Sequence, residues 1–170
     1  MVPQRRGEIS RARHVSSRMR LALYQPDIPQ NAGTLLRLGA CLGIGVDIIE
    51  PCGFLFTDSG FRRAGMDYLA AADYRRHESW TAFLAVQKAS RARLVLLSSK
   101  AARSYTEFAF AADDVILVGR ESAGVPDDVR EAVDAGLRIP LKPGLRSLNV
   151  ALAASMALGE ALRQTKGFPG

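Results

Sequence analysis

Short, continuously apolar segments alternate along this chain with longer segments of helical spacing, and this alternation restricts the fold more than any other feature. The apolar segments predict strands at 20–24, 46–50, 93–97, 114–118 and 137–139. The segments between them predict helices at 32–42, 61–65, 78–88, 126–135 and 147–164. Strands that are apolar throughout are buried on both faces, and strands that alternate with helices pair in parallel. The expected fold is therefore α/β, with a parallel sheet flanked by helices.

The size and charge of the chain suit one folded domain with a basic extension. A chain of 170 residues, 48% of them hydrophobic, is long enough to bury a core. It has no apolar run near the roughly 20 residues that a membrane helix needs. Of the net charge of +6, residues 1–18 contribute +4 through five arginines and one glutamate. We therefore expect a flexible basic arm over 1–18, which either attracts phosphate groups or is inert, and a single domain over 19–170.

The cysteines and histidines give no pattern for a metal site. Neither Cys41 nor Cys52 lies near His14 or His77 in the sequence, and no zinc-binding spacing occurs. Two cysteines in apolar surroundings are typical of buried, reduced thiols in a cytoplasmic protein. His77 lies in a polar stretch, where we expect it to pack or to face solvent instead of taking part in catalysis. The sequence thus predicts no metal.

The loops that follow the predicted strands are the places to expect a site, because parallel α/β sheets bind ligands beyond the carboxyl ends of their strands. After the fourth strand, Gly119 and Gly124 permit positive φ angles and close approach of a ligand to the backbone. Glu121 between them is suited to cap the turn or to accept a hydrogen bond from a ligand hydroxyl. An ordinary strand-to-helix turn is the simpler explanation of this loop on its own.

Polar residues also stand at the starts of two predicted helices. Ser147 is expected as the cap of the last helix, with Arg146 beside it. Asn149 falls inside that helix, where an amide is a poor choice unless it has a partner. Asn31 is expected as the cap of the first helix, and Arg37 follows six residues later. An arginine there is usually solvated, but it can also clamp a phosphate or a carboxylate.

Common nucleotide-binding and hydrolase motifs are missing from the sequence. It contains no P-loop and no GxSxG elbow. The segment Gly43-Ile44-Gly45 precedes a strand instead of following one, and it lacks the third glycine of a dinucleotide-binding loop. A P-loop ATPase, a dinucleotide-binding domain and a serine hydrolase are therefore disfavoured.

Taken in order, the polar loop residues resemble the three motifs of the SPOUT superfamily of RNA methyltransferases. The motifs are Asn31-x5-Arg37, Gly119-x-Glu121-x-x-Gly124, and Ile139-Pro140 with Ser147-Leu148-Asn149. Within this superfamily, three further segments resemble the TrmL-type tRNA ribose methyltransferases. These segments are Leu23 to Pro29, Ile48 to Phe54 and Arg63 to Tyr68. The resemblance extends from Met19 to Gly170.

The resemblance implies a fold in which the C-terminal segment threads through a loop to form a trefoil knot. It implies S-adenosyl-L-methionine as the cofactor, bound in the knot. It also implies a homodimer that joins through the knot region, with the helix at 148–162 as an interface face. The implied cofactor-binding residues are Leu97, Gly119, Ile139 and Ser147, with Gly124, Leu141 and Leu148 alongside.

The implied activity is methylation of the ribose 2′-hydroxyl of the wobble nucleotide, a cytidine or uridine at position 34, in the anticodon loop of tRNA. A ribose hydroxyl is a poor nucleophile and needs both activation and alignment. By resemblance Arg37 lies nearest that hydroxyl, and its role is electrostatic because a guanidinium stays protonated. Asn31, Glu121 and Asn149 complete the implied catalytic site.

Several basic residues are candidates for contacts with RNA phosphates, and these are Arg146, Lys100, Arg62 and Arg63. A solvated surface charge explains each of them equally well. The chain differs from the TrmL-type pattern at four positions, namely Arg120, Ala123, Leu152 and Gly159, and these differences bear on which nucleotide is modified. Ribose methylation at another tRNA or rRNA site and a non-catalytic RNA-binding module are the alternatives.

Overall fold

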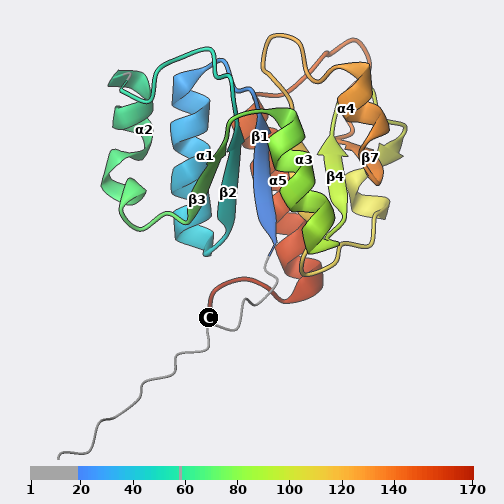
Figure 1. Cartoon of the computed structure of the whole chain (residues 1–170). Helices are drawn as coiled ribbons and strands as arrows, with labels where there is room; N and C mark the ends of the chain where they lie inside the picture. Colours follow the sequence, from blue (N-terminus) through green and yellow to red (C-terminus); the bar gives the residue numbers. More distant parts are fainter. Residues whose placement is uncertain (1–18, 58) are drawn as a thin grey trace, which may run out of the picture.

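The computed structural model describes residues 19–57 and 59–170, so the predicted basic arm lies outside the described residues. Within them, seven strands form one sheet in the order β3-β2-β1-β6-β4-β7-β5, and all neighbouring strands pair in parallel (Figure 1). The strands are β1 (Arg20–Tyr24), β2 (Gly45–Ile49), β3 (Tyr74–His77), β4 (Leu94–Leu97), β5 (Arg103–Ser104), β6 (Val115–Val118) and β7 (Ala135–Arg138). The predicted parallel α/β class is confirmed.

Helices cover both faces of this sheet (Figure 1). They are α1 (Pro29–Leu42), α2 (Ser59–Leu69), α3 (Trp80–Ser90), the short 3₁₀ helix η1 (Tyr105–Glu107), α4 (Asp127–Glu131) and α5 (Val150–Thr165). One core joins α1, α2 and α5 to a sheet face that includes Leu21 and Ile116. A second core joins α3 and α4 to the opposite face through Ala22 and Leu117, because successive side chains of a strand alternate between faces. No helix in the described part of the chain is long and apolar enough to cross a membrane.

Both helix caps predicted from the sequence were wrong. α1 begins at Pro29 with Ile28 in the cap position, because proline suits the first turn of a helix. Asn31 therefore lies inside α1, where it is buried. At α5 the cap is Asn149 instead of Ser147, and its side chain accepts hydrogen bonds from two backbone N–H groups of the first turn.

The sequence also missed the two edge strands and misjudged some boundaries. Three of the four side chains of β3 are exposed, because an edge strand pairs on one side only and needs no apolar run. β5 at the other edge has only two residues. α2 is longer than predicted, and α4 is shorter because β7 already begins at Ala135. Cys41 is exposed instead of buried, since it lies off the apolar stripe of α1.

The carboxylate of Asp47 on β2 is buried beside the edge strand β3. Asp47 of β2 accepts a hydrogen bond of 2.6 Å from Nε of Arg20 and lies 2.8 Å from Nε2 of His77. The ring of His77 meets the ring of Phe83 edge-on. His77 therefore packs in the interior, which was one of the two environments expected for it. Asp47 interrupts an otherwise apolar strand. Its carboxylate is tolerated in the interior because Arg20 and His77 supply hydrogen-bond partners.

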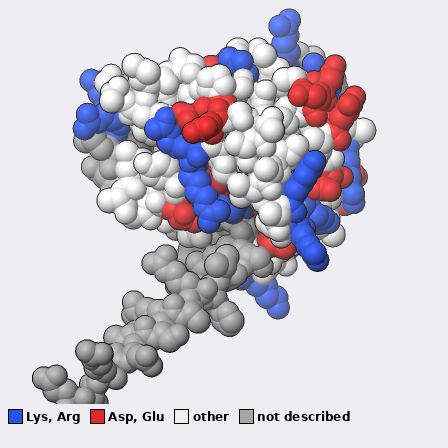
Figure 2. All heavy atoms as spheres, in the orientation of Figure 1, with Lys and Arg blue, Asp and Glu red and all other residues white. Residues whose placement is uncertain are grey.

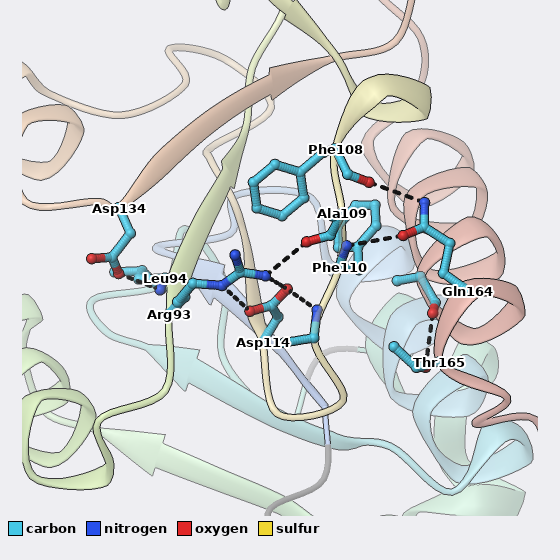
Figure 3. Close-up of polar contacts among 11 residues, drawn as sticks. Arg93, Leu94, Phe108, Ala109, Phe110, Asp114, Asp134, Gln164 and Thr165 are labelled. Carbon is cyan, nitrogen blue, oxygen red and sulfur yellow. Dashed lines mark hydrogen bonds and ion pairs between the residues drawn. The ribbon is translucent and has the colours of Figure 1, made fainter.

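A second buried carboxylate anchors the segment before β6 (Figure 3). Asp114 is fully buried and accepts hydrogen bonds of 2.8 and 2.7 Å from the guanidinium of Arg93, and one of 2.7 Å from the N–H of Ala111. The amide of Gln164 on α5 bonds to the same segment through one backbone C=O and one backbone N–H, at 3.0 and 2.9 Å. The segment 108–114 is thus fixed both to Arg93, the residue before β4, and to α5.

We expect Asp114→Ala to lower the free energy of unfolding by about 2–3 kcal/mol, because it leaves the partly buried guanidinium of Arg93 without its carboxylate. Chemical denaturation measures this change. The control is Glu107→Ala in the neighbouring η1, where the side chain is exposed and the expected change is below about 0.5 kcal/mol. Equally small changes for both variants would show that the Asp114 network does not stabilise the fold.

Candidate active site

A cavity of about 620 Å³ opens at the carboxyl ends of β4, β6 and β7, beside the start of α5. We call it the strand-end cavity. All seven residues that the sequence predicted for cofactor binding line it, namely Leu97, Gly119, Ile139, Ser147, Gly124, Leu141 and Leu148. The cavity lies at the edge where parallel α/β sheets bind ligands. Binding of a cofactor by these residues stays a prediction.

The loop after β6 folds back on itself at the cavity wall. Arg120 and Gly124 exchange two backbone hydrogen bonds of 2.9 Å each. Gly124 has a φ angle of +65°, which favours glycine. A β-carbon added to Gly119 would lie 2.6 Å from the carbonyl carbon of Gly124. Both glycines are therefore required by the shape of this loop.

Three polar side chains from separate elements meet at the wall of the strand-end cavity. Nδ2 of Asn149 donates to Oδ1 of Asn31 at 3.0 Å, and Nδ2 of Asn31 donates to Oε1 of Glu121 at 3.2 Å. Asn31 is only 8% exposed, so side chains instead of bulk water satisfy its amide. The sequence predicted all three as members of one site, and the structure brings them together.

Asp27 in the loop after β1 joins this polar group. Its N–H donates to Oε2 of Glu121 at 3.0 Å, and the N–H of Glu121 donates to Oδ1 of Asp27 at 3.2 Å. Burial, together with the neighbouring Asp27 side chain, raises the pKa of Glu121 above its usual value. The Glu121 side chain, followed by the Ser122 hydroxyl, holds the pKa of Asp27 below its usual value. Glu121 is therefore the member of the pair that takes up a proton first as the pH falls.

Three cations line the strand-end cavity, and only Lys100 among them was a predicted RNA contact. Arg120 donates from Nη1 to Oε1 of Gln25 at 3.4 Å, while its buried Nε has no hydrogen-bond partner within the described part of the chain. Arg130 lies 3.4 Å from a carboxylate oxygen of Asp127 on the same helix. These positive groups give the cavity a lining suited to an anionic ligand group.

The structure does not bring the other predicted cations to the cavity. Arg37 is exposed on α1, where its guanidinium lies 4.6 Å from the ring centre of Tyr68 and donates to the hydroxyl of that tyrosine at 3.4 Å. Arg146 is exposed in the loop before α5, and Arg62 and Arg63 are exposed on α2. Figure 2 shows basic and acidic side chains interspersed over one face of the molecule. The functional roles of these four arginines stay predictions.

Sequence reasoning missed part of the cavity lining. The missed residues include Ile28, Ser98, Ser99, Ser122, Val125, Arg130, Val150 and Ala153. Three of them carry a signal through their position, because Ser98 and Ser99 follow β4 and Val150 begins α5. Asp27 carried a comparable signal, since it stands between two prolines just after β1. Among the described residues, no group of three or more His, Cys, Asp or Glu side chains is placed to hold a metal ion.

Comparison with known proteins gives consistent matches. Residues 18–159 match the SpoU rRNA methylase family. A tRNA (cytidine(34)-2′-O)-methyltransferase of Beijerinckia indica subsp. indica is 62% identical over 144 residues, which cover 85% of this chain and 90% of the relative. A solved structure that concerns 2-OH methylation of C/U34 on tRNA has a TM-score of 0.80 and 41% identity, and covers 86% of this chain and 95% of that one. An AdoMet-bound rRNA methyltransferase from Sinorhizobium meliloti has a TM-score of 0.79 and 26% identity, and covers 86% of this chain and 56% of that one.

We expect Gly119→Ala to weaken binding of S-adenosylmethionine tenfold or more, about 1.4 kcal/mol, because the added methyl group collides with the backbone at Gly124. Isothermal titration calorimetry measures the affinity. The matched control is Gly136→Ala in β7, where the added β-carbon meets Ala101 at an ordinary contact distance of 3.5 Å. Equal affinities for both variants would contradict a cofactor site at this loop.

Proposed function

The chain belongs to the SpoU rRNA methylase family, and we propose that it methylates the ribose 2′-hydroxyl of nucleotide 34, a cytidine or uridine, in tRNA. The observation that carries this proposal is the high identity, over most of both chains, to a relative named for methylation of that ribose. The strand-end cavity supports it, because polar residues from three elements meet there beside a glycine-dependent backbone loop. This reaction would form an oxygen–methyl bond on the ribose, break the sulfur–methyl bond of S-adenosylmethionine, and release the hydroxyl proton and S-adenosylhomocysteine.

The strand-end cavity suits S-adenosylmethionine as the cofactor. Its volume of about 620 Å³ falls within the range of roughly 300–1,000 Å³ that is usual for small-molecule sites. Leu97, Ile139, Leu141 and Leu148 offer apolar surface for an adenine ring, and Gly119 lines the cavity where its loop folds back on Gly124. When bound, this cofactor supplies a methyl group activated by the positive charge on its sulfur.

The residues of the chain have to orient the ribose and polarise its hydroxyl, because a ribose hydroxyl is a weak nucleophile near neutral pH. We assign orientation to Asn31, Glu121 and Asn149, whose hydrogen bonds hold one another in place at the cavity wall. We assign to Arg37 an electrostatic role at the hydroxyl. That assignment rests on the resemblance, since the guanidinium lies against Tyr68 in the structure.

Further properties follow from the family. We expect the segment after β7 to form the trefoil knot, and we expect the protein to act in the cytoplasm, where its tRNA substrate is found. Lys100 at the cavity is the best placed of the predicted phosphate contacts. Arg146, Arg62 and Arg63 are proposed phosphate contacts outside the cavity, since they do not line it.

We also propose a homodimer that joins through α5 and the loop before it. Four large apolar side chains are exposed there, namely Leu145 (67%), Leu148 (38%), Leu152 (60%) and Met156 (42%). Leu152 and Met156 stand four residues apart, so they share one face of the helix. Several large apolar side chains exposed on one short segment are typical of a protein interface.

Methylation of nucleotide 34 can be tested with matched tRNA substrates. We expect methyl transfer to a tRNA with ribose at nucleotide 34, and none to the same tRNA with 2′-deoxyribose there, because the second lacks the acceptor hydroxyl. Incorporation of labelled methyl groups from S-adenosylmethionine measures the reaction. Undiminished methylation of the deoxyribose substrate would place the modification elsewhere in RNA. Binding of tRNA without methylation of either substrate would favour a non-catalytic module.

Arg37→Ala should reduce turnover strongly, by about 10²-fold or more, because it removes the charge assigned to the hydroxyl. Affinity for S-adenosylmethionine should change little, since Arg37 does not line the strand-end cavity. Steady-state kinetics and calorimetry measure the two quantities separately. An equal loss of both would assign Arg37 a structural role, through its contact with Tyr68.

Leu152→Glu should convert the proposed dimer to a monomer, because it places a charge in the apolar strip of α5. Sedimentation equilibrium measures the mass. The control is Leu55→Glu, since Leu55 is 76% exposed but stands in the loop after β2, outside α5. A monomeric wild-type protein, or a dimer that survives Leu152→Glu, would contradict this interface.

A further inference from the structure

We propose that Asp27 is a positioning residue of the methyl-transfer site: it holds the Glu121 carboxyl group in the wall of the strand-end cavity and joins the loops that follow β1, β2 and β6. The kinetic part of this inference rests on the proposed function. Its geometric part rests on the hydrogen bonds of Asp27. Asp27 does not itself line the cavity, so it acts through Glu121, which does.

Asp27 and Glu121 hold each other through reciprocal hydrogen bonds. The backbone N–H of each residue donates to the side-chain carboxylate of the other, at 3.0 and 3.2 Å. The second carboxylate oxygen of Asp27 accepts a hydrogen bond from the hydroxyl of Ser122. Rotation of the Glu121 side chain would break its bond with Asp27 together with its bond from Asn31. Glu121 is therefore fixed from the β1 loop and from α1 at once.

The loop after β2 encloses Asp27 from another side. The N–H of Gly53 donates to the C=O of Pro26 at 2.9 Å. A β-carbon on Gly53 would lie 2.7 Å from Cβ of Asp27 and 2.9 Å from its Cα, so only glycine permits this approach. The side chain of Asp27 is 18% exposed as a result. Three loops at the carboxyl edge of the sheet thus converge on this one residue.

The fixed orientation of Glu121 gives the cavity a defined hydrogen-bond acceptor. Each oxygen of an ionised carboxylate can accept two hydrogen bonds. Asn31 uses one acceptor position on Oε1, and the N–H of Asp27 uses one on Oε2. The remaining positions are available to a hydroxyl donor in the cavity, and ribose hydroxyls are donors of this kind. Protonation of Glu121 would remove part of this acceptor capacity.

The charge of Asp27 also influences the protonation of Glu121. Burial first, and the Asp27 side chain second, raise the pKa of Glu121. Arg120, with Nε 3.8 Å from the Asp27 carboxylate, favours the ionised form of Asp27. Cys52 on the β2 loop has its pKa raised to about 11, chiefly by burial, so it stays neutral where Glu121 titrates. Replacing Asp27 with uncharged asparagine should therefore lower the pKa of Glu121.

The test compares Asp27→Asn with Asp128→Asn, which removes an equal charge from an exposed position on α4. Carbon-13 NMR measures the titration midpoint of the Glu121 carboxyl group, and Glu121→Gln assigns the signal. We expect the midpoint to move to lower pH in Asp27→Asn and to stay in place in Asp128→Asn. The acid limb of the pH profile of kcat/KM for tRNA methylation should also move to lower pH. An unchanged midpoint in Asp27→Asn overturns the proposal, and so does a loss of rate that is equal at every pH.

Asp27→Ala removes the hydrogen bonds as well as the charge. We expect kcat to fall by on the order of 10²-fold, because the acceptor in the cavity is no longer held in position. An amide proton–nitrogen spectrum checks that the variant is folded, and wild-type turnover in the folded variant overturns the proposal. If Asp27→Ala does not fold, the isosteric Asp27→Asn carries the test.

The two proposals fail in distinguishable ways. The NMR titration of Glu121 needs no substrate, so it reports the effect of Asp27 whether or not tRNA is methylated. A wild-type protein that methylates no tRNA refutes the proposed function. A wild-type protein that methylates tRNA, combined with an unchanged Glu121 midpoint in Asp27→Asn, refutes the role of Asp27 alone.

Discussion

The hydrogen bonds of the Asn31 side chain are the interaction on which the site depends. Asn31 is buried near the start of α1, accepts a hydrogen bond from Asn149 and donates one to Glu121. Asn149 also caps α5, and Glu121 belongs to the loop that follows β6. One amide thus connects the first helix, the last helix and the central strands. Because buried amides are costly when unpaired, the position of each element constrains the positions of the other two.

Most of the fold could be predicted from the sequence because the central strands are buried on both faces. Such strands have to be almost entirely apolar, and this makes segments such as 115–118 easy to recognise. The edge strand β3 escaped prediction because three of its four side chains face solvent and two are arginines. The helix caps escaped for a different reason. Local preference favours Asn31 and Ser147, but Pro29 starts α1 earlier and Asn149 caps α5 while bonding to Asn31.

The candidate site could be predicted where its residues follow directly from position at the ends of strands. Gly119 and Glu121 stand just after β6, so their place at the cavity edge follows from the parallel sheet. Asp27 also stands just after a strand, but its contact with Glu121 could not be predicted from position, because Glu121 lies 94 residues farther along the chain. For Arg37 the sequence predicts more than the structure bears out. Its motif predicts a catalytic role, whereas its guanidinium lies against Tyr68 and does not line the strand-end cavity.

The guanidinium of Arg120 connects the electrostatics of the cavity to the carboxylate pair behind it. Arg120 lines the cavity, and its Nε lies 3.8 Å from the carboxylate of Asp27. An anion that binds at this guanidinium therefore competes with Asp27 for the same positive charge. Any such competition weakens the stabilisation of the ionised Asp27, and the proton affinity of the Asp27–Glu121 pair rises. An anionic group bound at Arg120 and the protonation of Glu121 would thus be linked through one side chain, and by reciprocity anion binding there would depend on pH.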